Sequence, residues 1–327
     1  MNKIAIIGAG SWGTALGQVL ADNGHRVMIY GRDMKVVTEL KNRRNQKFFG
    51  ELVLSEALGA TILLEEALQG ARYVLLAVPT KVMREVLQEI KNFLVGDVVI
   101  INASKGIEPE THKRMSEVVG EVLGNGHDFI ALSGPSHAEE VIVRQLTSVT
   151  CAGVDESCLK DVQQLFSNDY FRVYRSIDLI GVEIGGAIKN VIALGSGILS
   201  GLGFGDNAKA ALVTRGLVEI KRLGNALGAA EHTFMGLSGL GDLIVTAMSE
   251  HSRNYQAGYQ IGKNPEVAIA QLGMTVEGIR TCQAAYELSH KLEIDMPIVH
   301  AIYQVVFEKQ DPQAALLRLM QREIGAE

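Results

Sequence analysis

A lysine in an apolar helical run is the first candidate for chemistry in this chain of 327 residues. Lys189 carries the only formal charge between Ile184 and Gly205, a run otherwise made of aliphatic, small and a few polar residues. Burial of a lysine disfavours its ammonium form and lowers its pKa, so such a lysine can exchange a proton near neutral pH. The alternative is that Lys189 extends to a carboxylate at the surface. The helix alone leaves both open.

An acid in apolar surroundings is the best partner for this lysine. Asp242 lies between Gly241 and Leu243 in a punctuated segment, Leu237–Leu243, that we interpret as a loop. Because an unpaired buried carboxylate is costly, we expect Asp242 to meet a cation, and Lys189 is a good candidate. The alternative for Asp242 is an ordinary helix cap.

A second polar group lies further along the chain at Ser252-Arg253-Asn254. A guanidinium matches an oxyanion in bidentate fashion, so Arg253 with Asn254 suits a phosphate group. The alternative for Arg253 is a surface ion pair.

A glycine motif at the N-terminus indicates nucleotide binding. Gly8, Gly10 and Gly13 come after a short apolar run, Lys3–Ile7, and precede a helical pattern, Thr14–Asn23. In a strand–turn–helix unit these glycines permit the tight turn, the approach of a pyrophosphate and close packing of the helix. The N–H groups at the helix N-terminus then face the phosphates.

Cofactor choice depends on the residues just beyond the second predicted strand, Arg26–Tyr30. Enzymes that use NAD usually place an acid there to bind the ribose 2′-hydroxyl. This chain has Gly31 and Arg32, and a guanidinium suits a 2′-phosphate. We expect NADPH to be accepted as a cofactor. Because Asp33 is an acid close to the same place, NADH also stays possible.

Strands alternate with helices through the first half of the chain. Further strands are predicted at 61–64, 73–78, 98–102, 129–132, 148–152 and 170–174. This alternation predicts a mainly parallel, doubly wound (Rossmann-like) sheet in an α/β domain, residues 1–180. Beyond Asp178 the patterns are helical, which predicts an all-α domain at 181–327 that begins with a core helix packed through its glycines.

Ligands of such sheets lie at the carboxyl ends of the strands. Lys105 comes after one predicted strand there, and Gly134 and Ser136 come after another. A cation with hydroxyl and backbone donors at this edge suits an anionic ligand.

Composition limits the function classes. The net charge of −6 argues against a nucleic-acid surface, which needs a basic face. The three cysteines and eight histidines have no metal-ligand spacing, and free thiols fit a reducing cytoplasm. The N-terminal run is too short for a targeting segment and the Lys189 helix too interrupted for a membrane span, so we expect no membrane insertion and no metal.

Seven motifs occur in order along the chain: GAGSWGTALG (8–17), NASKGIE (102–108), SGPSHAEEV (133–141), EIGGAIKNVIALGSGI (183–198), GLSGLGDLIVT (236–246), SRN (252–254) and VEGIRT (276–281). With these motifs the chain closely resembles bacterial NAD(P)-dependent glycerol-3-phosphate dehydrogenases. The resemblance implies interconversion of sn-glycerol 3-phosphate and dihydroxyacetone phosphate with NADP or NAD, feeding phospholipid synthesis in the cytoplasm, and a homodimer.

The resemblance also implies a role for individual residues. It makes Lys189 the proton donor and acceptor. It places Lys105, Gly134, Ser136, Lys189, Asp242, Ser252, Arg253 and Asn254 at the substrate. It places Gly8, Gly10, Ser11, Trp12, Gly13, Arg32, Lys105, Ala138, Arg253, Thr275 and Glu277 at the cofactor. Thr275 stands where the family often has valine.

Two other functions are compatible with the same architecture. A dehydrogenase acting on a β-hydroxy acid would need a carboxylate site in place of the Arg253–Asn254 phosphate site. A non-catalytic nucleotide sensor could lose Lys189 or Lys105 without penalty, whereas this chain has both.

Overall fold

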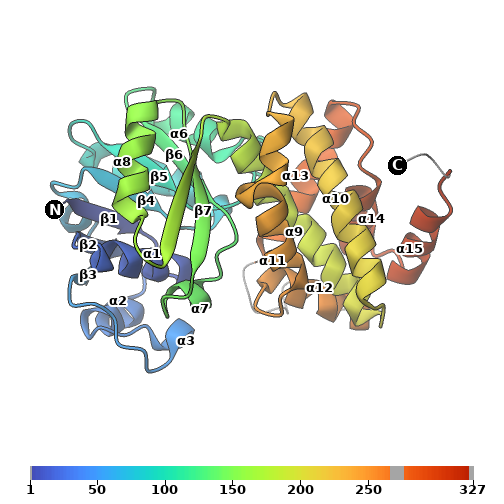
Figure 1. Cartoon of the computed structure of the whole chain (residues 1–327), viewed down its shortest axis with the longest axis horizontal. Helices are drawn as coiled ribbons and strands as arrows, with labels where there is room; N and C mark the ends of the chain where they lie inside the picture. Colours follow the sequence, from blue (N-terminus) through green and yellow to red (C-terminus); the bar gives the residue numbers. More distant parts are fainter. Residues whose placement is uncertain (1, 266–275, 324–327) are drawn as a thin grey trace. The chain divides into compact units, whose positions relative to one another are not determined.

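The computed structural model of the chain describes residues 2–265 and 276–323 (Figure 1). The chain divides into two compact units. Unit 1 comprises residues 1–105 and 113–182, and unit 2 comprises residues 106–112 and 183–327. The domain boundary between residues 180 and 181 stays a prediction, because compactness does not establish that either part folds alone.

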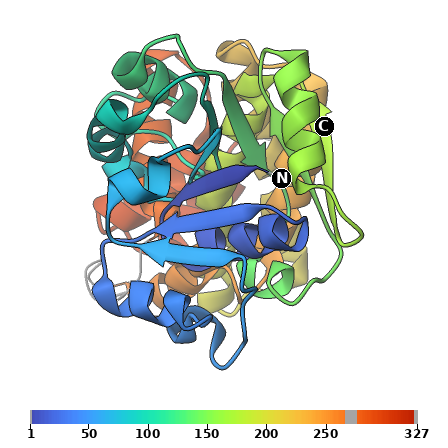
Figure 2. The ribbon, with the colours of Figure 1, turned by 90° about the vertical axis from the view of Figure 1, so that its left-hand side faces the viewer.

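Unit 1 is built on an eight-stranded sheet with the order β3-β2-β1-β4-β5-β6-β7-β8. The strands are β1 (Lys3–Ile7), β2 (Arg26–Tyr30), β3 (Leu58–Thr61), β4 (Tyr73–Leu76), β5 (Val99–Asn102), β6 (Phe129–Ser133), β7 (Thr147–Ala152) and β8 (Phe171–Ser176). Figure 2 shows β1, β2 and β3 side by side in blue. Neighbouring strands are parallel except β6 and β7, which are antiparallel, so the predicted mainly parallel sheet is confirmed.

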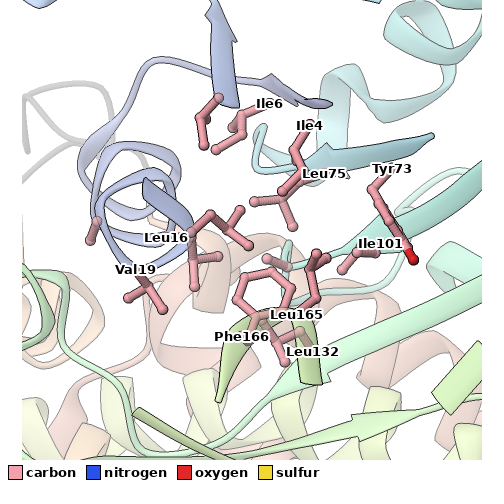
Figure 3. Packing of buried hydrophobic residues seen from close by; sticks show 14 of the residues in the cluster. Ile4, Ile6, Leu16, Val19, Tyr73, Leu75, Ile101, Leu132, Leu165 and Phe166 are labelled. Atoms are coloured by element: carbon pink, nitrogen blue, oxygen red, sulfur yellow. The ribbon is translucent and has the colours of Figure 1, made fainter. Parts of the chain in front are cut away.

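Both faces of the sheet are covered because the central strands are apolar on both sides. Ile4 and Ile6 of β1 point into one hydrophobic cluster, whereas Ala5 and Ile7 point into the other. Figure 3 shows the first cluster, where helices α1 (Ser11–Asp22) and α8 (Glu156–Phe166) supply Leu16 and Phe166 among others. Such two-sided burial is typical of parallel sheets.

The remaining helices of unit 1 connect the strands. They are α2 (Met34–Lys41), α3 (Gln46–Phe49), α4 (Leu64–Leu68), η1 (Thr80–Val82), α5 (Met83–Ile90), η2 (Lys91–Phe93), α6 (Met115–Leu123) and α7 (Ala138–Val141).

One predicted strand was placed three residues too late. The structure forms β3 at Leu58–Thr61 rather than at 61–64, and Thr61 pairs with Tyr30 at its end. The Thr61 Oγ1 accepts a hydrogen bond from the Leu63 N–H at 3.0 Å, which turns the chain out of the sheet and into α4. A local threonine turn of this kind competes with strand pairing.

Unit 2 is built of helices from residue 183 onward in the part that the structure describes, whereas its short segment 106–112 consists of turns and a single β-bridge residue. Its elements are α9 (Leu179–Gly201, which starts in unit 1), α10 (Asp206–Ala226), η3 (Glu231–Met235), η4 (Leu237–Gly241), α11 (Asp242–Met248), α12 (Arg253–Lys263), α13 (Glu277–Lys291), α14 (Pro297–Phe307) and α15 (Pro312–Met320). The expectation that helices replace strands after Asp178 is therefore confirmed.

Helices α9 and α12 pack backbone to backbone. A Cβ added at Gly197 of α9 would lie 2.0 Å from the Tyr255 carbonyl oxygen, and one at Gly258 of α12 would lie 2.0 Å from the Leu194 carbonyl oxygen. No side chain fits at either contact, so the predicted packing of the core helix through its glycines is confirmed.

The segment expected to be a loop, Leu237–Leu243, is helical instead. Leu237–Gly241 forms a turn of π-helix that leads into α11, and the Gly241 N–H donates to the Gly236 carbonyl oxygen at 3.1 Å. A Cβ at Gly239 would lie 2.2 Å from the Phe234 carbonyl oxygen, so this glycine serves close packing, which the sequence pattern did not distinguish from a helix break.

Helix α9 is the one described helix that is long and apolar enough to cross a membrane. However, 89% of its most apolar stretch of 18 residues is buried within the protein, as in the core helix of a folded domain.

Candidate active site

The lysine singled out from the sequence is buried in unit 2 and paired. The side chain of Lys189 on α9 is 6% exposed, and that of Asp242 at the start of α11 is 1% exposed. The Lys189 Nζ donates to the Asp242 Oδ1, and it also donates to the Thr246 Oγ1 at 2.7 Å. The predicted pairing is confirmed. Because a buried ammonium is stabilised by a carboxylate and a hydroxyl together, this site can hold a proton on nitrogen away from water.

Thr246 is a member of this network that the sequence analysis missed. Its hydroxyl lies 3.4 Å from the Asp242 Oδ1, one helical turn along α11. Spacing of four residues places two side chains on the same helix face. The signal was therefore present in the sequence, but it becomes visible only when residues 242–248 are recognised as a helix.

Asn190, which follows Lys189 in the sequence, belongs to a hydrogen-bonded chain that joins three helices. The Asn254 Nδ2 of α12 donates to the Asn190 Oδ1 of α9 at 2.9 Å, and the Asn254 Oδ1 accepts from the Gly278 N–H of α13 at 2.9 Å. A Cβ at Gly278 would lie 2.5 Å from the Asn190 carbonyl oxygen, so only glycine permits this approach. Asn254 thereby fixes the face of α9 that carries Asn190.

Two further predicted residues lie at the start of α12. Ser252 is buried and is the N-cap of the helix, where its Oγ accepts from the Tyr255 N–H at 3.3 Å. Arg253 is the first helical residue, and its side chain is exposed. A guanidinium at a helix N-terminus combines two features that attract an anion. Glu277 is the first residue of α13, whereas Thr275 lies outside the described residues.

The glycine turn in unit 1 has the geometry that a dinucleotide requires. Gly8 has φ +126°, and a Cβ there would lie 2.4 Å from the Ala77 carbonyl oxygen. A Cβ at Gly13 would lie 2.1 Å from the Gly8 carbonyl oxygen, so helix α1 packs directly on the turn. A Cβ at Gly10 would meet nothing within 4 Å, and no side chain caps α1. The open space at Gly10 and the uncapped N–H groups of α1 therefore fit a pyrophosphate.

The residues after Gly10 are held by the core and by an asparagine. Ser11 and Trp12 begin α1, and the Trp12 ring packs against the first hydrophobic cluster. The Trp12 Nε1 is buried and has no hydrogen-bond partner among the described residues. The buried Asn45, which the sequence analysis did not single out, donates from Nδ2 to the Thr14 Oγ1 at 2.9 Å and braces this turn.

Lys105 and Ser136 converge on one carbonyl at the carboxyl edge of the sheet. The Lys105 Nζ donates to the Gly134 carbonyl oxygen at 3.0 Å, and the Ser136 Oγ donates to the same oxygen at 2.8 Å. Gly134 has φ +147°, and a Cβ there would lie 2.8 Å from the Val149 Cα, so the turn requires glycine. Ala138 is the buried first residue of α7.

Asn102 shapes the loop that carries Lys105. The Asn102 Nδ2 donates to the Ser104 carbonyl oxygen at 2.9 Å, and the Asn102 Oδ1 accepts from the Ser104 N–H at 3.2 Å. The Ser104 Oγ in turn donates to the Val78 carbonyl oxygen at 2.7 Å. These bonds close a side-chain turn directly after β5, so the position of Lys105 is set by the strand end.

Arg32 is not a free cation at the end of β2. Its Nη2 donates to the Glu85 Oε1 at 3.0 Å and to the Glu89 Oε1 at 2.8 Å, both on α5. Asp33 is the acid that was expected to leave NADH binding possible. It is the N-cap of α2, where its Oδ1 accepts a hydrogen bond from the Lys35 N–H at 2.8 Å.

Neither metal ligation nor thiol chemistry has support among the residues that the structure describes. No group of three or more His, Cys, Asp or Glu side chains there could hold a metal ion. The three cysteines are free and buried, and burial raises the pKa of Cys151 and of Cys158 to about 12. Thiols with so high a pKa are poor nucleophiles.

Comparisons with known proteins decide the family. The model for the N-terminus of NAD-dependent glycerol-3-phosphate dehydrogenase matches residues 3–159, and the model for its C-terminus matches residues 178–317. The chain belongs to the NAD-dependent glycerol-3-phosphate dehydrogenase family. The resemblance inferred from the motifs is therefore confirmed.

Relatives in this family match over nearly their whole length. The NAD(P)+ glycerol-3-phosphate dehydrogenase of Shouchella clausii is 53% identical, over 98% of this chain and 96% of the relative. That of Limosilactobacillus fermentum is 47% identical, over 100% of this chain and 99% of the relative. The crystal structure of glycerol-3-phosphate dehydrogenase from Coxiella burnetii superposes with a TM-score of 0.93 at 35% identity, covering 98% of this chain and 99% of that chain.

The fold extends beyond glycerol-3-phosphate dehydrogenases. A D-mandelate dehydrogenase superposes with a TM-score of 0.64 at 14% identity, over 96% of this chain and 99% of that chain. At that identity the likeness concerns the fold alone. The family assignment therefore rests on the two matching models and the full-length relatives.

Proposed function

We propose that this protein is an NAD(P)-dependent sn-glycerol-3-phosphate dehydrogenase, which reversibly reduces dihydroxyacetone phosphate to sn-glycerol 3-phosphate. The observation that carries this proposal is the buried Lys189, held by Asp242 and Thr246 in a chain of this family. A structural helix has no need of a desolvated ammonium, whereas carbonyl reduction needs a proton donor.

Unit 1 is the proposed binding region for the nicotinamide dinucleotide. The turn formed by Gly8, Gly10 and Gly13 would receive the pyrophosphate, with Ser11 and Trp12 beside it. When bound, the reduced cofactor supplies the hydride. On the family resemblance, Arg32, Lys105 and Ala138 of this unit are proposed as further cofactor residues. The same resemblance adds Arg253, Thr275 and Glu277, which belong to unit 2.

Lys189 is the proposed proton donor. As the ammonium, it gives a proton to the substrate oxygen while the carbonyl carbon receives hydride, so the products are the alcohol and the oxidised cofactor. In the oxidative direction neutral Lys189 takes the hydroxyl proton. Asp242 and Thr246 hold the nitrogen through the hydrogen bonds described above and stabilise its charged form.

The proposed phosphate site is the start of α12. Arg253 offers an exposed guanidinium beside the N-terminus of the helix, and Ser252 lies at the N-cap. Asn254 is assigned a positioning part, since its amide already bonds Asn190 and Gly278. Lys105 is proposed to polarise the substrate oxygen, with Gly134 and Ser136 lining the substrate.

The physiological setting is also proposed. The family resemblance supports a cytoplasmic enzyme that supplies phospholipid synthesis and works as a homodimer. Light scattering coupled to size-exclusion chromatography measures the oligomeric state, and a monomeric mass at micromolar concentration would contradict the dimer.

The decisive experiment mixes the purified protein with dihydroxyacetone phosphate and monitors nicotinamide absorbance, with NADPH and NADH in parallel. We expect oxidation of the cofactor that depends on the phosphate ester. A panel of β-keto acids serves as the matched control in this reductive direction. Turnover of a panel member without turnover of dihydroxyacetone phosphate would refute the substrate assignment and leave the nucleotide-binding unit intact.

A further inference from the structure

The end of β2 carries an ion-pair arrangement that the proposed reaction does not use. Dinucleotide-binding folds place the ribose 2′ group just beyond this strand, facing an acid in NAD enzymes or an arginine in NADP enzymes. Gly31 cannot be replaced by the acid, since a Cβ there would lie 2.7 Å from the Ala9 Cβ. Asp33 caps α2. Arg32 is therefore the polar side chain at this strand end that remains to meet the 2′ group.

The partners of Arg32 come from another helix. Glu85 and Glu89 are one turn apart on α5, and both receive hydrogen bonds from the same nitrogen, Nη2 of Arg32. The opposite face of α5 is anchored by Met83 and Leu87 in the second hydrophobic cluster, so the two carboxylates are held toward Arg32.

We propose that Glu85 and Glu89 determine cofactor specificity by competing with the 2′-phosphate of NADPH for Arg32. This inference rests on the proposed binding of a nicotinamide dinucleotide at the glycine turn. A 2′-phosphate carries a charge of about −1.5 to −2, similar to that of the carboxylate pair, so it must displace the glutamates and then lies beside them. The uncharged 2′-hydroxyl of NADH meets no such repulsion. The pair thus lowers the advantage of NADPH over NADH.

The exposure of the three side chains limits the size of the effect. Arg32 is 49% exposed, Glu85 59% and Glu89 38%. Exposed ion pairs change an equilibrium constant by roughly one- to fivefold each, so two pairs together can contribute up to about 25-fold. We expect a value in the middle of that range, a change in affinity of about three- to tenfold. Salt screens charges separated by more than about 10 Å at 0.1 M, so the effect shrinks as ionic strength rises.

The test measures dissociation constants of NADPH and NADH by nicotinamide fluorescence, which needs no turnover. The variant Glu85→Gln/Glu89→Gln keeps the side-chain shape and removes both charges. We expect NADPH to bind about three- to tenfold more tightly and NADH to change by less than about twofold. The control Glu65→Gln/Glu156→Gln removes two exposed charges elsewhere in unit 1 and should leave the NADPH to NADH ratio unchanged.

Adding Arg32→Ala to the wild type and to the double glutamine variant completes a mutant cycle that measures the coupling between Arg32 and the two glutamates. Loss of Arg32 should weaken NADPH binding more in the Glu85→Gln/Glu89→Gln background than in the wild type, because only there is the guanidinium fully available. Unchanged or weaker NADPH binding by the double glutamine variant would overturn the inference and show that the carboxylates orient Arg32. Binding of both nucleotides without reduction of dihydroxyacetone phosphate would refute the proposed reaction only. A wild type that binds neither nucleotide would refute both.

Discussion

Breaking the buried pair between Lys189 and Asp242 should separate its contribution to stability from its part in the reaction. Lys189→Met removes the ammonium and leaves the Asp242 carboxylate, 1% exposed, beside the neutral Thr246 hydroxyl. Loss of the partner of a buried charge costs about 3–5 kcal/mol. Lys189→Met/Asp242→Asn removes both charges and should recover most of this loss.

The expected loss of folding free energy can be expressed as a decrease in melting temperature. A folding unit of 150–250 residues loses about 2–4 °C per kcal/mol, so Lys189→Met should melt about 6–20 °C below the wild type. Both variants lose the proton donor, and general acid catalysis raises a reaction rate by about a hundredfold to ten-thousandfold. The double variant should therefore be nearly as stable as the wild type and at least about a hundredfold slower.

Three measurements decide the matter: thermal unfolding monitored by circular dichroism, NADPH binding by fluorescence, and reduction of dihydroxyacetone phosphate. A double variant that folds, binds NADPH and turns over at the wild-type rate would refute Lys189 as the proton donor. A Lys189→Met protein as stable as the wild type would refute the argument that Asp242 is charged in the folded state.

Three further predictions concern pH, the glycine turn and the phosphate site. Burial raises the pKa of Glu219 from 4.5 to about 7, while its carboxyl oxygens accept from the Ile298 and Val299 N–H groups at 2.6 and 3.0 Å. Since the folded state then holds this proton more tightly than the unfolded state, stability should fall as pH rises from about 4.5 through 7, and melting curves of Glu219→Gln should lack this component. Gly10→Ala should leave the melting temperature unchanged but weaken nucleotide binding at least about tenfold, because its Cβ meets no protein atom within 4 Å but fills the proposed pyrophosphate space. Gly13→Ala should instead destabilise the protein, and equal melting temperatures for the two variants would contradict the packing argument. Arg253→Ala should raise the KM for dihydroxyacetone phosphate about tenfold or more at unchanged melting temperature, and steady-state kinetics with an unaltered KM would exclude a phosphate contact.

Much of the fold is encoded in local patterns. The strand at Arg26–Tyr30 was predicted with both ends correct, because a short apolar run bounded by turn residues has few other structures open to it. The strand at Leu58–Thr61 was predicted three residues too late, because Leu58-Gly59-Ala60 has little strand character of its own. Its place depends on pairing with β2, which is a long-range contact.

The candidate site was predictable where burial forces a partnership. The energetic cost of burying a lone charge pointed from Lys189 to Asp242 across 53 residues of sequence, and the structure bears this out. Thr246 and Asn45 were not predicted, because a neutral hydroxyl or amide can form hydrogen bonds with the nearby backbone. Its burial therefore does not require a distant partner as the burial of a charge does. The catalytic and binding roles of all these residues remain predictions.

The sequence by itself determined the family, the nucleotide-binding turn, the mainly parallel sheet and the buried lysine, because each depends on residue types at short fixed spacings. Only the tertiary structure decided what the exposed charges meet. The sequence predicts that Arg32 can receive a phosphate, whereas in the structure it lies against Glu85 and Glu89, which are 53 and 57 residues away in the chain. An exposed charge tolerates water as readily as a partner, so no local pattern specifies its neighbours, and the packing of α5 beside β2 has to bring them together.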